Sequence, residues 1–214
     1  MNKGCIVDQK LPLKPKHVGA ICVLLELAEN HRNQALFTLA IDSKLRGCDL
    51  VRMKVVDLMT SGQIKARAFI LQSKTQKPVR SEISERTRAS VATWMKDPLM
   101  VRTEFLWLER FHERLHIPTR QCARIVLACV SSIGSEVTAY STHSVKRTKV
   151  TQIYKKTSNL RALQLQLGHT KMDTTVRQLD VELKDTLSIT EATEVLSKWT
   201  AQTFCKITDC NPKI

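Results

Sequence analysis

The hydrophobic periodicity of the chain changes twice, and this order limits the folds that it can adopt. Residues 16–30 and 33–44 carry apolar side chains at helical spacing, and a short helical turn follows Gly47 at 49–53. Three short runs rich in β-branched residues come next, at 54–59, 65–72 and 79–83. Helical periodicity then returns over residues 84–95, 119–130, 142–156, 159–167, 172–183 and 190–199. The sequence therefore predicts a mainly α domain with a small three-stranded antiparallel β-sheet (α+β).

Neither an internal repeat nor a Gly/Ser-rich linker divides the 214 residues, which favours one domain. We expect a leader at 1–14, a domain at 15–185, and a C-terminal helix and tail at 186–214. The longest apolar runs, such as 21–25, are much too short to span a bilayer. The first twenty residues also lack the apolar segment of a signal peptide. The sequence thus indicates a cytoplasmic protein without a membrane partner.

The charge of the chain is strongly positive, with 34 Lys and Arg against 20 Asp and Glu and a net charge of +14. Such a field concentrates polyanions, and nucleic acid is the commonest of these partners. A basic protein that binds ribosomes or acidic lipid remains an alternative. Seven scattered cysteines contain no Cys-x-x-Cys pair, which argues against a disulfide framework and a zinc site. We expect neither a metal nor a cofactor.

Two segments in the first half of the chain carry candidate phosphate ligands. Arg46 stands at a predicted helix junction, and Asp49 follows it by three residues. The polar turn 73–79 between two predicted strands contains Lys74 and Lys77. On their own, Arg46 and Asp49 would be read as a solvent-facing salt bridge, and a turn lysine as a solvated cation.

Two further segments lie in the second half. His143 follows Thr142 at a predicted helix start, and Lys146 comes three residues later. Leu167-Gly168-His169 ends the next helix, and Gln178 lies nine residues after His169. Alternatively, His143 is an ordinary helix-start residue and His169 belongs to a helix C-cap.

Together, and in this order, the four segments resemble the catalytic domain of the tyrosine recombinase (phage integrase) family over about residues 11–185. The resemblance is close to a subset of short bacterial integrases that lack a separate arm-binding domain. The resemblance implies the tyrosine recombinase catalytic-domain fold, double-stranded DNA as partner, and DNA integration and recombination as the activity. It assigns catalytic positions to Arg46, Lys74, His143, Lys146, His169 and Gln178, with Asp49 as a supporting acid and Lys77 as a weaker alternative to Lys74.

The chemistry of the family explains these residue types. Strand cleavage passes through a pentacoordinate phosphate, whose extra charge two arginines can hold. A lysine can protonate the leaving 5′ oxygen, and histidines act as acid–base groups. A tyrosine oxygen attacks phosphorus and forms a phosphotyrosyl link.

Two positions depart from the family pattern. Lys146 stands where the second arginine is expected, and lysine keeps the charge but loses the bidentate fork. The adjacent Arg147 points about 100° away on a helix and cannot simply replace it. Gln178 stands at the nucleophile position, and an amide does not attack a phosphodiester. The two tyrosines, Tyr140 and Tyr154, are both distant in sequence from that helix.

A dense set of basic residues accompanies these segments and predicts contacts along the DNA backbone, although an ordinary wet helix face would look similar. The set comprises Lys44, Lys77, Arg147, Lys149, Lys155 and Lys156. Trp94, Trp107 and Trp199 have apolar neighbours and are expected in the core or at a docking surface. Leu196 and Trp199 could anchor a neighbouring protomer or an intramolecular cap.

The sequence therefore predicts a DNA-binding member of the family that is impaired in cleavage. Three alternatives stay open. The chain could be an active recombinase that takes a tyrosine from a partner subunit. It could be a non-catalytic DNA-binding regulator that occupies a recombination site or pairs with an active recombinase. In either case we expect self-association or a partner recombinase on DNA. It could also be a decayed product of a mobile element.

Overall fold

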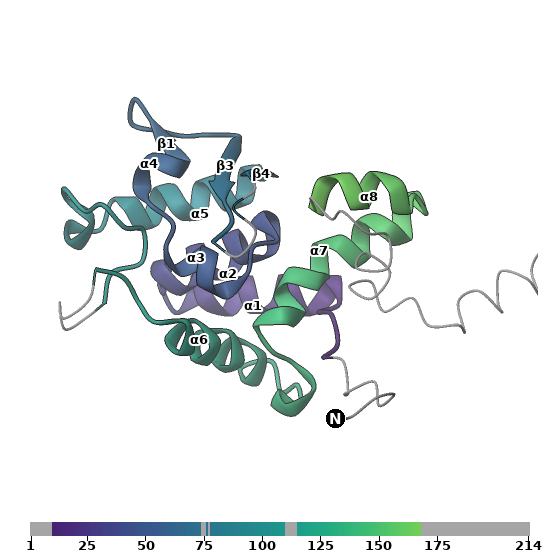
Figure 1. Cartoon of the computed structure of the whole chain (residues 1–214). Coiled ribbons are helices and arrows are strands. Elements are labelled where there is room, and N and C mark those ends of the chain that lie inside the picture. Colours follow the sequence, from purple (N-terminus) through teal and green to yellow (C-terminus); the bar gives the residue numbers. More distant parts are fainter. Residues whose placement is uncertain (1–9, 74–75, 77, 110–114, 168–214) are drawn as a thin grey trace, which may run out of the picture. The chain divides into compact units, whose positions relative to one another are not determined.

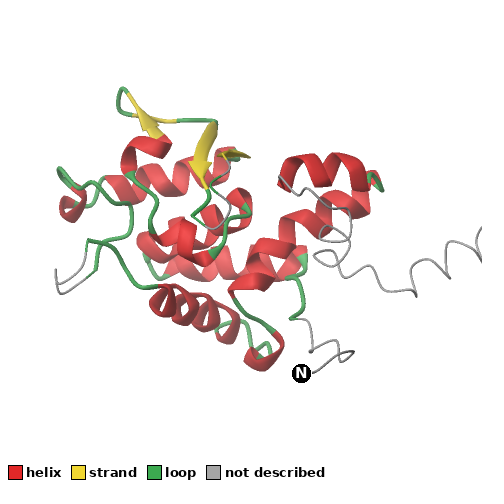
Figure 2. Cartoon of the chain, viewed as in Figure 1, coloured by secondary structure: helices red, strands yellow, loops and turns green. Residues whose placement is uncertain are grey.

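A computed structural model of the chain describes residues 10–73, 76, 78–109 and 115–167, all within one compact unit, Met1–Leu179. Helices dominate these residues (Figures 1 and 2). The helices are α1 (Pro15–Leu27), α2 (His31–Ser43), α3 (Gly47–Val51), α4 (Val55–Leu58), α5 (Glu85–Met95), α6 (Thr119–Ser131), α7 (Thr142–Thr157) and α8 (Leu160–Leu167), with short 3-10 turns η1 (Pro98–Met100) and η2 (Val137–Ala139). The strands are β1 (Met59–Thr60), β2 (Gln63–Ile64), β3 (Arg67–Leu71) and β4 (Pro78–Glu82).

Helix α2 is the central element of the core. Every residue from Gln34 to Ser43 is buried, and Leu36, Phe37 and Leu39 are completely inaccessible. The helix packs against α1, α5 and α7, so from Gln34 onward none of its sides faces solvent. A helix that is buried all round fixes its neighbours on every side. The chain that leaves its C-terminus, at Lys44–Arg46, is therefore held firmly.

The strands form two separate antiparallel ladders rather than one three-stranded sheet. Strands β1 and β2 pair Met59 with Ile64, while β3 and β4 pair from Arg67–Glu82 to Leu71–Pro78. In both β3 and β4 the residues alternate between exposed and buried, as expected of a hairpin with one covered face. The mainly helical class with a small antiparallel β insert is confirmed, with its strands arranged differently.

The predicted strand at 54–59 is wrong over most of its length. The Lys54 N–H donates to the Asp57 carboxylate at 2.9 Å, and this bond closes the first turn of α4. A local side-chain acceptor three residues ahead thus overrides the β preference of Val55 and Val56. Only Met59, with Thr60, enters a strand.

The predicted helices within the described residues are confirmed, with ends displaced by at most three residues. The largest shift is at α1, which stops at Leu27 instead of residue 30, because Glu29 adopts a left-handed conformation with φ of 50°. The helices predicted at 172–183 and 190–199 lie outside the described residues. In the part of the chain that the structure describes, no helix is long and apolar enough to cross a membrane.

The buried side chains agree with the predicted core. Trp94 is 5% exposed and Trp107 is completely buried, and their indole N–H groups donate to the carbonyls of Leu106 and Leu50. Both tryptophans are thus core residues, while Trp199 lies outside the described region. Cys22, Cys122 and Cys129 are buried free thiols that pack as small hydrophobic side chains.

Replacement of Trp107 by alanine should lower the free energy of unfolding by about 3–5 kcal/mol, since it opens a cavity and leaves the Leu50 carbonyl unpaired. Urea denaturation followed by circular dichroism measures the change. Leu115, which is 70% exposed, provides the control, and Leu115→Ala should stay within about 0.5 kcal/mol of the wild type. Equal effects of the two substitutions would contradict this packing.

Candidate functional site

Arg46 occupies the junction between α2 and α3. Its carbonyl accepts hydrogen bonds from the N–H groups of Asp49 (3.0 Å) and Leu50 (2.9 Å), so Arg46 is the N-cap residue of α3. The Nη1 atom of its guanidinium is buried and makes no hydrogen bond within the described part of the chain. Buried donors are rarely left unpaired in native proteins. An acceptor from outside the chain would satisfy this donor.

Asp49 connects this junction to the β3–β4 hairpin. Its carboxylate is buried, with the residue 3% exposed, and Oδ1 accepts the Ser73 N–H at 2.9 Å. The other oxygen, Oδ2, has no hydrogen-bond partner among the described residues. Ser73 immediately precedes Lys74, so Asp49 fixes the base of the predicted lysine loop beside Arg46. Lys74 and Lys77 themselves lie outside the described residues.

Helix α7 contributes His143 and Lys146. The Ser141 hydroxyl caps the helix by accepting a hydrogen bond from the His143 N–H at 3.2 Å. The Ser144 hydroxyl in turn accepts one from the Ser141 N–H at 3.0 Å. His143 is exposed on the first turn, and Lys146 follows one turn later, half-buried. With Gly47, Lys146 lines a cavity of about 10 Å³ between α3, α6 and α7. A space this small holds no more than one water molecule.

The charges of Lys146 and Arg46 act on each other. Burial, as the larger cause, and the positive charge of Arg46 together lower the pKa of the Lys146 amine to about 8. The neighbouring Asp49 and Cys48 act in the opposite sense. The cation at the N-cap of α3 and the cation of α7 thus repel each other, and an external anion would stabilise this arrangement.

A second buried carboxylate, Asp42, lies one turn before Arg46. Its Oδ1 accepts the Lys149 amine of α7 at 2.7 Å, and its Oδ2 accepts the N–H (2.8 Å) and Oγ–H (2.5 Å) of Ser84. Burial raises the pKa of Asp42, but these hydrogen bonds outweigh it and the net pKa is lowered. Asp42 therefore stays ionised and joins α2, α7 and the start of α5.

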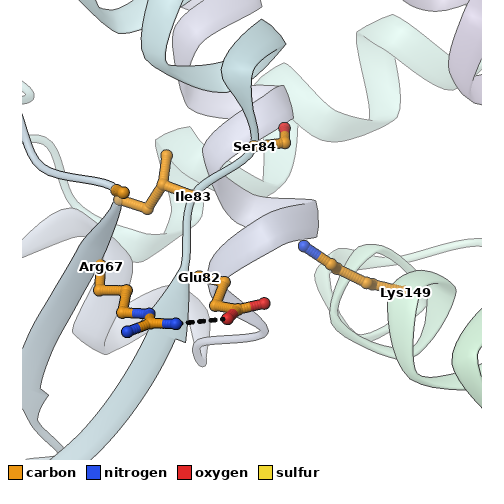
Figure 3. A pocket seen from close by; sticks show the side chains of 6 residues that line it. Arg67, Glu82, Ile83, Ser84 and Lys149 are labelled. Carbon is orange, nitrogen blue, oxygen red and sulfur yellow. Dashed lines mark ion pairs between the residues drawn. The ribbon is translucent and has the colours of Figure 1, made fainter.

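An open pocket of about 420 Å³ lies next to this carboxylate, between the base of the hairpin, the start of α5 and helix α7 (Figure 3). The side chains that line it are Ala66, Arg67, Glu82, Ile83, Ser84 and Lys149. On the hairpin side Arg67 pairs with Glu82 at 3.5 Å, and Lys149 enters from α7. Both basic groups of the pocket therefore have an intramolecular carboxylate partner.

Three of the predicted DNA-binding residues are buried or have hydrogen-bond partners within the protein. Lys44 is 8% exposed in a left-handed conformation (φ 56°), and burial together with the charge of Lys149 lowers its pKa. Arg147 is 6% exposed and donates to the Lys10 carbonyl at 2.8 Å. Lys149 pairs with Asp42, whereas Lys155 and Lys156 are exposed in the last turn of α7.

The structure thus brings Arg46, Asp49 and Lys146 together, with His143 one turn away on α7. His169 and Gln178 lie outside the described residues. Asp42 and Ser84 were missed in the sequence, because an acid within a helical pattern is normally read as a solvated side chain. Within the described ranges, no group of three or more His, Cys, Asp and Glu side chains is placed to hold a metal ion.

Comparison with known proteins gives a consistent picture. The model of the phage integrase family matches residues 13–182. A curated relative, described as a probable integrase/recombinase YoeC of Bacillus subtilis (strain 168), is 28% identical over 156 residues, which cover 73% of this chain and 81% of YoeC.

Solved structures agree at the level of the fold. The crystal structure of XerA recombinase matches 90% of this chain with a TM-score of 0.70 and 13% identity. That of XerH recombinase, in a post-cleavage complex with a palindromic difH substrate, matches 85% with a TM-score of 0.66 and 15% identity. The chain spans 66% and 54% of the lengths of these two recombinases. The match of the family model over most of its length shows that the chain belongs to the phage integrase family, and it has the fold of a tyrosine recombinase catalytic domain.

Proposed function

We propose that the chain binds duplex DNA through a phosphate site and does not cleave it unaided. Among the described residues this site consists of Arg46, His143 and Lys146. Lys74 and His169 complete the proposed site. The observation that carries the proposal is the buried Nη1 donor of Arg46, which has no acceptor among the described residues and lies beside the half-buried amine of Lys146. A phosphate oxygen would accept from Arg46 and offset the repulsion between the two cations.

The remaining basic residues would supply non-specific affinity. The net charge of +14 attracts a polyanion, and the exposed Lys155 and Lys156 are placed to follow a phosphate backbone. XerH is described with a palindromic difH substrate, and a palindromic site matches a two-fold arrangement of protomers. We therefore propose double-stranded DNA and either a second copy or a partner recombinase as partners. The domain would extend over residues 15–185, in the cytoplasm.

Two residues that differ from the family pattern are the reason why we propose binding without cleavage. Lys146 holds one phosphate oxygen as a point charge, whereas an arginine would hold two in a fixed fork. Gln178 supplies no oxygen nucleophile, so a phosphotyrosyl link cannot form on this residue. A chain that binds its site without cleaving it would act as a regulator of recombination. Cleavage would need a tyrosine from a partner subunit.

Restoring the nucleophile tests this proposal. On a nicked suicide substrate, Gln178→Tyr combined with Lys146→Arg should capture labelled DNA covalently, while the wild type should bind the DNA without an adduct. The single Gln178→Tyr variant should form less adduct, because the second arginine fork is absent. Denaturing electrophoresis with labelled DNA measures the adduct.

The outcomes separate the alternatives. An adduct formed by the wild type would contradict the non-cleaving proposal and identify an unforeseen nucleophile. Failure of the double variant to form an adduct, while DNA is still bound, would contradict the placement of Gln178 at the nucleophile position.

The affinity for DNA should fall as the pH rises through about 8, the pKa of Lys146. A bound phosphate favours the charged amine, so binding above this pH takes up a proton and weakens by up to about tenfold per pH unit. Lys146→Arg should remove this dependence, because a guanidinium stays charged. Fluorescence anisotropy of a labelled duplex measures the affinity, and parallel pH profiles of the two proteins would contradict the role of Lys146.

The free energy of unfolding of the unbound chain should rise with pH, whereas the affinity for DNA should fall. The pKa of Lys146 is about 8 in the folded chain and 10.5 when unperturbed, so the folded state holds fewer protons between these values. The free energy of unfolding therefore gains from this group as the pH rises from about 8 to 10.5. Arg46, Asp49 and Cys48 are the charged or titratable groups that act on Lys146.

A further inference from the structure

The Asp42 carboxylate joins three segments that are far apart in the sequence. Asp42 belongs to α2, Lys149 to α7, and Ser84 is the N-cap residue of α5. Ion-pair and hydrogen-bond distances of 2.5–2.8 Å connect the carboxylate to both partners. We call Asp42, Ser84 and Lys149 the Asp42 junction.

Each segment of the junction leads directly to a residue of the proposed phosphate site. Arg46 follows Asp42 by four residues, across the C-terminus of α2. Lys146 precedes Lys149 by three residues, less than one turn of α7. Ser84 follows the β3–β4 hairpin, whose loop contains Lys74. The junction therefore links the segment that carries Arg46 to the segment that carries Lys146.

The Asp42 junction is sufficiently buried to fix the positions of the segments that it joins. The side chain of Asp42 is 9% exposed and that of Lys149 is 25% exposed. Loss of one partner would leave a desolvated charge, and the segments would have to move to hydrate it. The surface ion pair Lys54–Glu104, at the same 2.7 Å distance but with side chains 45% and 59% exposed, lacks this constraint.

We propose that Lys149 is a positioning residue, which acts through Asp42 to hold the α7 cation Lys146 opposite Arg46, and does not itself bind phosphate. This inference rests on the proposed function. It reassigns a residue that the sequence placed among the DNA contacts. The reason is geometric: the Lys149 amine has a buried carboxylate at 2.7 Å, whereas Lys146 lines the small cavity beside Gly47, the residue that follows Arg46.

Lys149 could position Lys146 through Asp42, or it could contact phosphate directly. A change at Asp42 should have opposite effects on the affinity for DNA in these two cases. Asp42→Asn removes a negative charge near the site, and long-range electrostatics alone would raise the affinity for DNA. If the junction positions the site, the same change should lower the affinity, because α7 loses its anchor.

Equilibrium binding of a short fluorescein-labelled duplex to the full chain, over a series of salt concentrations, separates these roles. Asp42→Asn and Lys149→Gln should each weaken binding by about tenfold, within the range of coupling between contacting residues, and the double variant should be no weaker than either. The slope of log affinity against log salt should stay unchanged, because no phosphate contact is lost. Lys149→Arg should bind nearly as well as the wild type.

Lys54→Gln provides the matched control and should change the affinity by less than about twofold, as expected of an exposed pair. Thermal melts confirm that each variant is folded at the temperature of the assay. A gain in affinity with Asp42→Asn, or a slope that falls by about one charge with Lys149→Gln, would overturn the proposal in favour of a direct contact.

A second measurement does not depend on DNA binding. The NMR resonances of the Lys146 side chain, followed against pH, report its pKa without a ligand. In Asp42→Asn and Lys149→Gln the pKa should rise from about 8 towards the ordinary value, because Lys146 is no longer held beside Arg46. An unchanged pKa would refute the positioning role. If the wild type fails to bind duplex DNA while this pKa shifts as expected, the proposed function fails and the junction stands.

Discussion

Two buried carboxylates, Asp42 and Asp49, flank Arg46, and the arrangement of the candidate site depends on the bonds that they accept. Asp42 holds α7 and the start of α5, and Asp49 holds the chain at Ser73, where the hairpin loop begins. Helix α2 supplies the rigid base, because it is buried on all sides. The segments next to Arg46, which follows this helix, are therefore positioned by hydrogen bonds and an ion pair to two buried carboxylates.

This arrangement destabilises the unbound protein, and a bound anion would offset the destabilisation. The charge of Arg46 acts on Lys146 against that of Asp49, and Lys44 is buried in a left-handed conformation two residues before Arg46. Each feature destabilises the unbound protein. Clusters of like charge are characteristic of sites that bind an ion of the opposite sign. The same local features that weaken the fold are thus those expected of a site for a phosphodiester.

Much of the fold could be predicted from the sequence, because helical periodicity records which face of each segment is buried. The strand predicted at 54–59 failed because one hydrogen bond, from the Lys54 N–H to Asp57, decides the local structure. That Arg46 and Lys146 belong to one site could be expected only from a family resemblance, since a hundred residues separate them in the sequence. The orientation of basic residues was the least predictable property. Lys149 and Lys155 look alike in sequence, yet one pairs with a buried carboxylate and the other faces solvent.

The central claim is that Arg46 and Lys146 bind phosphates of duplex DNA, and the salt dependence of binding tests it most directly. The affinity of the wild type, Arg46→Gln and Lys146→Gln for one labelled duplex should be measured over a range of salt concentrations near neutral pH. Each variant should bind more weakly, and its slope of log affinity against log salt should be smaller than that of the wild type by about one. Slopes equal to that of the wild type would show that neither cation touches the backbone and would contradict the account.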